Sequence, residues 1–145
     1  MKTAIVYYSE HHGNTKKLVD AIAPDAVIDV TKYKIEDLSQ YDLIGFASGI
    51  YYGKFAERIL TFAEKNLPTG KDVFFLATCG SKRDGYFNIM KAIALTKKCN
   101  ILGTYLCLGF DTYGPFKLIG GIAKGHPTAK EIQEAVNFYD NLRIE

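Results

Sequence analysis

The feature that most constrains this chain is a repeated order of short apolar runs separated by segments in which apolar residues recur at helical spacing. Each run is rich in β-branched or aromatic residues, as strands buried on both faces of a sheet are. The strong runs lie at residues 3–9, 43–49, 73–79 and 101–109, and a weaker one lies at 26–30. These runs predict five strands of a parallel sheet.

Helices are predicted between and after these strands. Apolar residues recur at helical spacing in residues 14–23, 55–66, 86–98 and 128–142. The last segment opens with the capping-box pattern Thr128-Ala-Lys-Glu131, directly after Pro127. Residues 31–42 indicate only a short or irregular helix.

Five βα units of this kind predict an α/β fold, a doubly wound five-stranded parallel sheet in the order 2-1-3-4-5 with helices on both faces. A chain of 145 residues fits one such domain, residues 1–145. Ligands of these sheets bind beyond the carboxyl ends of the strands, where the strand order reverses. The rule directs attention to three loops, at residues 9–15, 48–54 and 79–86.

The first loop, residues 9–15, has the composition of an anion site. Gly13 allows a close backbone approach, Asn14 or Thr15 can cap the next helix, and the unpaired amides of a helix start attract phosphate. The same residues also make an ordinary turn and N-cap, so both interpretations stay open. The candidate ligands are Ser9, His11, His12, Gly13, Asn14 and Thr15.

The second and third loops offer flat side chains beside glycines. Adjacent tyrosines in residues 48–54 can face an aromatic ring, although a tight turn with partly exposed tyrosines also explains them. Cys79, at the end of the fourth strand, is either a redox thiol or a small apolar strand-end residue, and we favour the second. The candidate ligands here are Ser48, Gly49, Ile50, Tyr51, Tyr52 and Gly53, with Thr78, Cys79, Gly80 and Tyr86.

With these loops in view, the sequence resembles the flavodoxin-like family over essentially its whole length. The resemblance is carried by residues 5–15 (IVYYSEHHGNT), the Ile50-Tyr-Tyr-Gly53 turn, and the pairs Cys79-Gly80 and Tyr86-Phe87. It implies that the first loop wraps the phosphate of FMN, the second meets the flavin edge near N5, and the third clasps the pyrimidine side. Two departures are visible: three residues rather than two precede the first-loop glycine after the hydroxyl residue, and no aromatic stands inside the third loop.

Two functions are implied by the resemblance. The first is an electron carrier that holds FMN and passes single electrons between redox partner proteins, as a monomer or weak dimer. The alternative is an FMN-dependent oxidoreductase that reduces a quinone or similar small acceptor by hydride transfer. The short chain, with no evident acid or base beside the predicted ring, favours the carrier.

Composition argues against several other classes. A net charge of +2 without a long basic run argues against nucleic acid. No stretch approaches the roughly 20 apolar residues of a membrane span, and the apolar N-terminal run is too short for a signal peptide. Cys79, Cys99 and Cys107 lack metal-ligand spacing, which predicts free thiols in a reducing cytoplasm and no metal site.

Two further features leave alternatives open. Residues 109–127 form a long connection before the last helix, in which Tyr113 and Phe116 are expected to reach over the flavin edge, to form a docking surface or to pack into a small apolar cap. His126 is expected to be a turn residue. The pI near 8.3 predicts a milder potential for reduction of the flavin and acidic partners, although solvated surface lysines explain it equally well.

Overall fold

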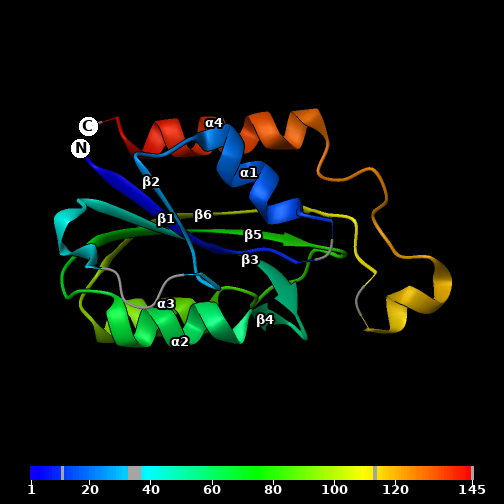
Figure 1. The fold of residues 1–145 in the computed structure, drawn as a ribbon, viewed down its shortest axis with the longest axis horizontal. Helices are drawn as coiled ribbons and strands as arrows, with labels where there is room; N and C mark the ends of the chain where they lie inside the picture. Colours follow the sequence, from blue (N-terminus) through cyan, green and yellow to red (C-terminus); the bar gives the residue numbers. More distant parts are fainter. Residues whose placement is uncertain (11, 33–36, 113, 145) are drawn as a thin grey trace.

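The sheet is parallel and follows the predicted strand order. A computed structural model describes residues 1–10, 12–32, 37–112 and 114–144 (Figure 1). Its strands run in the spatial order β2-β1-β3-β5-β6, with a short β4 paired to β3. The expected order 2-1-3-4-5 is therefore confirmed, and the labels differ only because β4 intervenes. The strands are β1 (Thr3–Tyr8), β2 (Ala26–Asp29), β3 (Leu43–Tyr51), β4 (Lys54–Phe55), β5 (Asp72–Cys79) and β6 (Asn100–Leu108).

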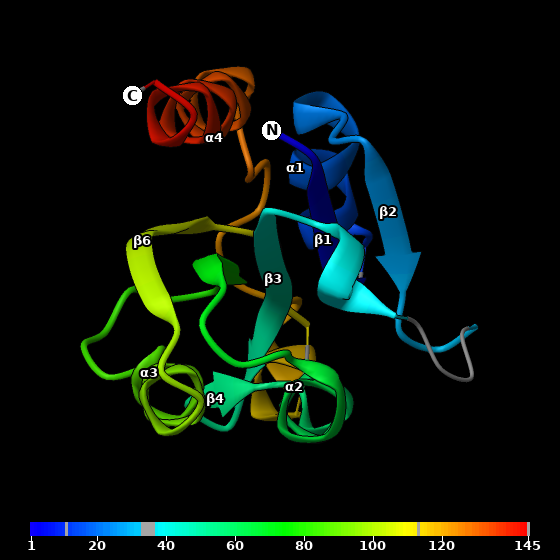
Figure 2. The same cartoon turned by 90° about the vertical axis from the view of Figure 1, so that its left-hand side faces the viewer.

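The continuous apolar runs arise because both faces of the sheet are covered. Phe74 packs on the side of α1 and α4, whereas its neighbour Phe75 packs on the side of α2 and α3. Successive residues of a strand point to opposite faces, so two buried faces require an unbroken apolar run. Figures 1 and 2 show the four helices in these two layers. They are α1 (Asn14–Ile22), α2 (Glu57–Asn66), α3 (Asn88–Thr96) and α4 (Ala129–Leu142).

Strand β4 was missed by the sequence-based prediction. β3 continues past residue 49 and turns back, so that Ile50 pairs with Phe55 and Tyr51 with Lys54 in an antiparallel hairpin. The two turn residues, Tyr52 and Gly53, have φ values of 51° and 82°, as the favoured two-residue hairpin turns require. A strand of two residues is too short to show a periodic apolar pattern, which is why only the turn was predicted.

The segment 31–42 and the start of α4 can both be compared with the sequence-based prediction. The weak segment 31–42 contains a 3-10 helix, Leu38–Gln40, while residues 33–36 lie outside the described part of the chain. The capping box at the start of α4 is confirmed, with Glu131 N–H donating to Thr128 Oγ1 at 3.1 Å and Thr128 N–H donating to Glu131 Oε1 at 2.8 Å. Among the described residues, no helix has the length and apolar character that crossing a membrane requires.

Candidate functional site

The three candidate loops meet at one edge of the sheet. Tyr8 of β1 lies beside Ser48 of β3, and Gly49 of β3 lies beside Thr78 of β5, so the carboxyl ends of these strands are neighbours. A buried contact also joins the first loop to the third, because the hydroxyl oxygens of Thr15 and Thr78 are 3.0 Å apart. The edge predicted from strand order is therefore the edge at which these loops converge.

The first loop turns sharply into the start of α1. His12 and Gly13 have φ values of 68° and 63°, and Gly13 is an N-cap residue that contributes no side-chain hydrogen bond. The Lys16 N–H donates to Ser9 Oγ at 3.3 Å. The first turn of α1 contains no acidic residue. Because no residue of that turn brings a carboxylate to the positive end of the helix dipole, this helix start suits an anion.

A narrow polar cleft of about 30 Å³ lies between the start of α1 and the ends of β3, β5 and β6. Asn14 is only 7% exposed, and its Nδ2 donates to the Phe110 carbonyl at 2.8 Å. Within the described part of the chain, the buried Oδ1 of Asn14 has no hydrogen-bond partner. The carboxylate-bearing residues Glu10 and Asp111 also line the cleft, together with Thr78 of β5. The cleft therefore presents mainly hydrogen-bond acceptors.

Tyr51 narrows the polar cleft. Its ring lies so close to Gly49 that a Cβ on that glycine would stand 3.2 Å from the Tyr51 hydroxyl. It also makes an edge contact with Tyr8, at 6.0 Å between ring centroids. Burial, followed by the charge of Glu10, raises the pKa of Tyr51 well above its ordinary value. The phenol is therefore neutral at physiological pH.

A larger aromatic cavity of about 340 Å³ opens next to the polar cleft. Tyr52, Tyr86 and Phe116 supply its aromatic side chains, and its volume falls in the range of small-molecule sites, roughly 300–1,000 Å³. The Tyr86 hydroxyl donates to the Ser81 carbonyl at 2.6 Å, which closes the third loop on itself. Tyr52 is 79% exposed, so this wall of the cavity faces solvent.

Residues of both charge signs line the aromatic cavity and shift the pKa values of its titratable groups. Arg83 and Asp111 both line it. Burial raises the pKa of Tyr86 most, Arg83 lowers it, and Asp111 raises it. Burial also raises the pKa of Cys79 to about 11, with Lys82 acting against it. The Cys79 thiol is therefore protonated at neutral pH, which favours the strand-end interpretation over a reactive thiolate.

The β6–α4 loop, residues 109–127, folds over this edge of the sheet. Asp111 and Ile122 exchange backbone hydrogen bonds of 2.9 and 2.8 Å, so the loop doubles back on itself. Ile122 packs against Gly80, where a Cβ would stand 2.5 Å from Cδ1 of the isoleucine. The Phe110 ring stacks on His12, with centroids 4.3 Å apart and an interplanar angle of 28°. The loop is thus self-packed and contacts both the first and the third loops, while Tyr113 lies outside the described residues.

The predicted ligand residues divide into three groups. Ser9, His12, Gly13, Thr15 and Ser48 line neither the cleft nor the cavity, and His11 lies outside the described residues. The polar cleft brings together Asn14, Gly49, Ile50, Tyr51, Thr78, Cys79 and Gly80. The aromatic cavity is lined by Ile50, Tyr52, Gly53, Cys79, Gly80 and Tyr86.

Two of the predicted residues that line neither the cleft nor the cavity, Ser48 and Thr15, make buried hydrogen bonds within the fold. Ser48 is fully buried; its hydroxyl donates to the Gly49 carbonyl at 2.6 Å and accepts from the Ala56 N–H at 3.0 Å. These bonds hold the β3–β4 hairpin in place. Thr15 is also buried, and its hydroxyl contacts Thr78 rather than the open face of the first loop.

Several lining residues were not predicted. Glu10 is exposed and also lines the polar cleft. Gly109, Phe110 and Asp111 follow directly on β6, so the rule of carboxyl ends would have found them had it been applied to the fifth strand. Arg83 is one of the basic residues in or beside the predicted loops, and the structure places it in the lining of the aromatic cavity.

Comparisons with known proteins agree with this fold. The sequence model of a family described as a flavodoxin domain matches residues 5–98. An uncharacterized protein of Methanocaldococcus jannaschii is 39% identical, with 98% of each chain covered. Oxidised flavodoxin 1 from Bacillus cereus has the same fold, with a TM-score of 0.71, 18% identity and 100% of each chain covered. A flavoprotein from Lactobacillus acidophilus, solved in complex with FMN, gives a TM-score of 0.55 at 21% identity, over 72% of this chain and 92% of its own.

Proposed function

This chain belongs to the flavodoxin family, and from that premise we propose that it binds FMN across its three loops and carries electrons between redox partner proteins. We propose further that it acts in the cytoplasm, as a monomer or a weak dimer. One observation carries the proposal: an acid-free helix start, an acceptor-lined cleft and an aromatic cavity adjoin at the sheet edge.

The residues of this edge fit FMN part by part. The phosphate suits the start of α1, because the first turn of that helix contains no acidic residue and the amides of a helix start attract anions. The hydroxyl-bearing chain of FMN is a hydrogen-bond donor, and the buried Oδ1 of Asn14 is an acceptor that lacks a partner among the described residues. The flat ring suits the cavity between Tyr52, Tyr86 and Phe116. The solved complex of the Lactobacillus acidophilus relative with FMN supports this choice of ligand.

The chain's own residues would orient and tune the ligand. Bound FMN supplies the electron chemistry, because its ring can take up and release electrons. Asn14 and Thr78 would accept hydrogen bonds from the hydroxyl chain, and the backbone of Gly49 to Tyr52 would face the ring edge. Arg83 and Asp111 would act on the charge that reduction places on the ring.

Exposure at the aromatic cavity favours a carrier over an enzyme. Tyr52 is 79% exposed, so a ring held beside it would have an edge near the surface, within reach of another protein. Burial keeps the pKa of Cys79 and Tyr86 raised, so neither group is a base at neutral pH. A protein that passes electrons at a surface needs no such base.

Titration calorimetry with FMN and with riboflavin tests the binding proposal. We expect one FMN per chain, and weaker binding of riboflavin because it lacks the phosphate. Phe116→Ala should weaken FMN binding about two- to tenfold, the usual range for an aromatic contact. Leu118→Ala is the matched control, since Leu118 lies in the same 3-10 helix, is 88% exposed and lines neither cleft nor cavity. Absence of heat with FMN in large excess over folded protein would refute the proposal.

A small pocket favours the second candidate, the FMN-dependent oxidoreductase. It measures about 260 Å³ and lies on the hairpin, where its lining includes Tyr8, Tyr51 and Tyr52 together with the basic residues Lys54 and Arg58. Such a pocket could take a small aromatic acceptor next to the ring. Rapid steady-state reduction of a soluble quinone by a nicotinamide donor would support this candidate, whereas slow turnover with stepwise one-electron reduction would support the carrier.

A further inference from the structure

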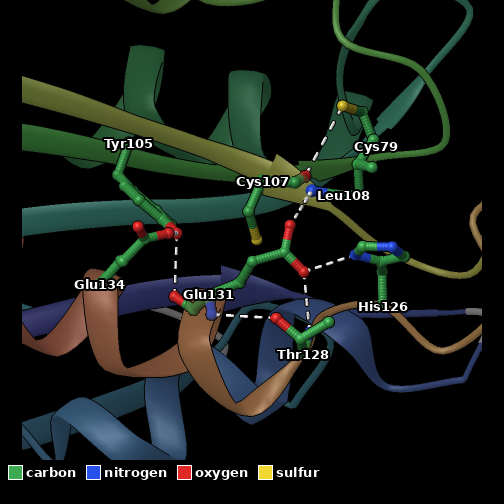
Figure 3. Close-up of polar contacts among 8 residues, drawn as sticks. All are labelled: Cys79, Tyr105, Cys107, Leu108, His126, Thr128, Glu131 and Glu134. Carbon is green, nitrogen blue, oxygen red and sulfur yellow. Dashed lines mark hydrogen bonds and ion pairs between the residues drawn. The ribbon is translucent and has the colours of Figure 1, made fainter.

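A single carboxylate closes the base of the β6–α4 loop (Figure 3). Glu131 Oε2 accepts a hydrogen bond from the Leu108 N–H at 3.3 Å, at the end of β6. Its other oxygen, Oε1, accepts from the Thr128 N–H at 2.8 Å and lies 2.6 Å from Nδ1 of His126. Glu131 therefore contacts the residue before the loop and the residues at its far end.

The carboxylate is well shielded and remains ionised. The Glu131 side chain is 14% exposed, and Figure 3 shows the Cys107 thiol directed toward it. Burial acts to raise the pKa of Glu131, but hydrogen bonds from the Thr128 backbone and from His126 outweigh it, so the pKa lies below its usual range. A half-buried, ionised carboxylate with three partners fixes the positions of all three.

Helix capping explains only part of this arrangement. The capping box requires one Glu131 oxygen to accept from Thr128 and the Glu131 N–H to donate to the Thr128 hydroxyl. It does not require the bond from the second oxygen to Leu108. That bond joins α4 to the end of β6, so it ties one end of the loop to the other.

Short contacts connect the two ends of the β6–α4 loop to the candidate FMN site. The Phe110 N–H donates to the His126 carbonyl at 2.9 Å, so the two ends of the loop also contact each other directly. The Phe110 carbonyl accepts from Asn14 at 2.8 Å, and the Phe110 ring stacks on His12. The next residue, Asp111, lines both the polar cleft and the aromatic cavity.

We propose that Glu131 is a positioning residue for FMN binding, which clamps the two ends of the β6–α4 loop and thereby holds Phe110 and Asp111 at the polar cleft. This role rests on the proposed function. Glu131 acts through the loop, since it lines neither the cleft nor the cavity.

Glu131→Gln tests the hydrogen bond to Leu108 separately from the capping box with Thr128. A glutamine keeps one carbonyl oxygen for Thr128 but presents an NH₂ group to the Leu108 N–H, so donor faces donor and the clamp opens. We expect FMN to bind about tenfold more weakly, as the loss of one hydrogen bond to a charged group predicts. Glu134→Gln is the matched control, because it makes the same change one turn later, where the side chain contacts the Tyr105 hydroxyl at 3.4 Å.

Two further readouts distinguish positioning from simple loss of stability. Amide hydrogen exchange of folded Glu131→Gln should accelerate at residues 109–112 and stay unchanged in the second half of α4. The midpoint potential of bound FMN should rise, because a loosened Asp111 carboxylate no longer opposes negative charge on the ring. A raised potential with unchanged affinity and exchange would report only the lost charge, and would overturn the proposal.

His126→Ala keeps the test decisive if Glu131→Gln does not fold. It removes one of the three clamp partners and leaves both capping-box hydrogen bonds in place, so we expect about threefold weaker FMN binding. Wild-type affinity in both folded variants would overturn the clamp while leaving FMN binding intact. Failure of the wild-type protein to bind FMN would instead overturn the proposed function, so the two failures are distinguishable.

Discussion

Thr15 is a polar residue in the first turn of α1 whose side chain is buried. Thr15 was selected as a phosphate ligand because hydroxyl residues are common at anion-binding helix starts. Its hydroxyl instead lies in the interior, 3.0 Å from that of Thr78. Sequence alone does not distinguish a hydroxyl that faces the open side of a helix start from one that faces the interior.

This pair supports a stability prediction. Thr15→Val should lower the free energy of unfolding by about 1–3 kcal/mol, because it leaves the buried Thr78 hydroxyl without its partner. The double variant Thr15→Val/Thr78→Val should recover part of that loss, since no unpaired hydroxyl remains. Urea denaturation of the single and double variants measures the coupling. Strictly additive losses would contradict the pairing.

Arg83 and Asp111 act in opposite directions on the aromatic cavity, and their effects can be measured one residue at a time. Arg83→Gln should lower the midpoint potential of bound FMN, because it removes a positive charge beside the reduced ring. Asp111→Asn should raise it for the opposite reason. Spectroelectrochemical titration of the two variants checks the signs. Shifts of the same sign in both would show that neither charge acts directly on the ring.

At the scale of elements, a glycine on β3 makes room for a phenylalanine on β5. A Cβ on Gly45 would stand 2.3 Å from Cζ of Phe74 on the neighbouring strand, so the ring occupies the space above the glycine. Gly45→Ala should cost about 1–3 kcal/mol through overpacking. Adding Phe74→Leu should reduce the extra cost of the alanine, because the smaller side chain vacates that space. Thermal unfolding of the single and double variants tests this, and equal costs of the alanine in both backgrounds would contradict it.

The junction of β6 and α4 supports a prediction about pH. Because the pKa of Glu131 is lowered in the folded protein, its carboxylate stabilises the fold above the pKa of an unfolded glutamate, about 4.3. That contribution is lost as pH falls through the lower, folded pKa. The gap in unfolding free energy between wild type and Glu131→Gln should therefore narrow below about pH 4. Urea midpoints measured across that range check it, with Glu134→Gln as the control for a lost charge on α4.

At the scale of the whole molecule, the basic pI does not describe the local charge around the candidate site. Lys16 pairs with Asp20 at 2.8 Å, and Lys54 forms an ion pair with Glu57. Arg83 lines the aromatic cavity, yet Asp111 lies there too. The expectation of a mild potential and acidic partners stays a prediction, because local pairing rather than total charge sets the field at a site.

How much of the molecule could be predicted differs with the range of the interactions involved. Apolar runs and helical spacing predicted the helices, the five strands of the parallel sheet, their order and the edge at which the three loops converge, because burial of both sheet faces leaves a continuous local pattern. They did not predict the short strand β4. The capping box at Thr128 was equally local. What only the tertiary structure decided are the contacts between distant segments: Thr15 with Thr78, Phe110 with His12, and Glu131 with Leu108. Such contacts depend on how a loop folds back in space, and no periodicity in the sequence records that.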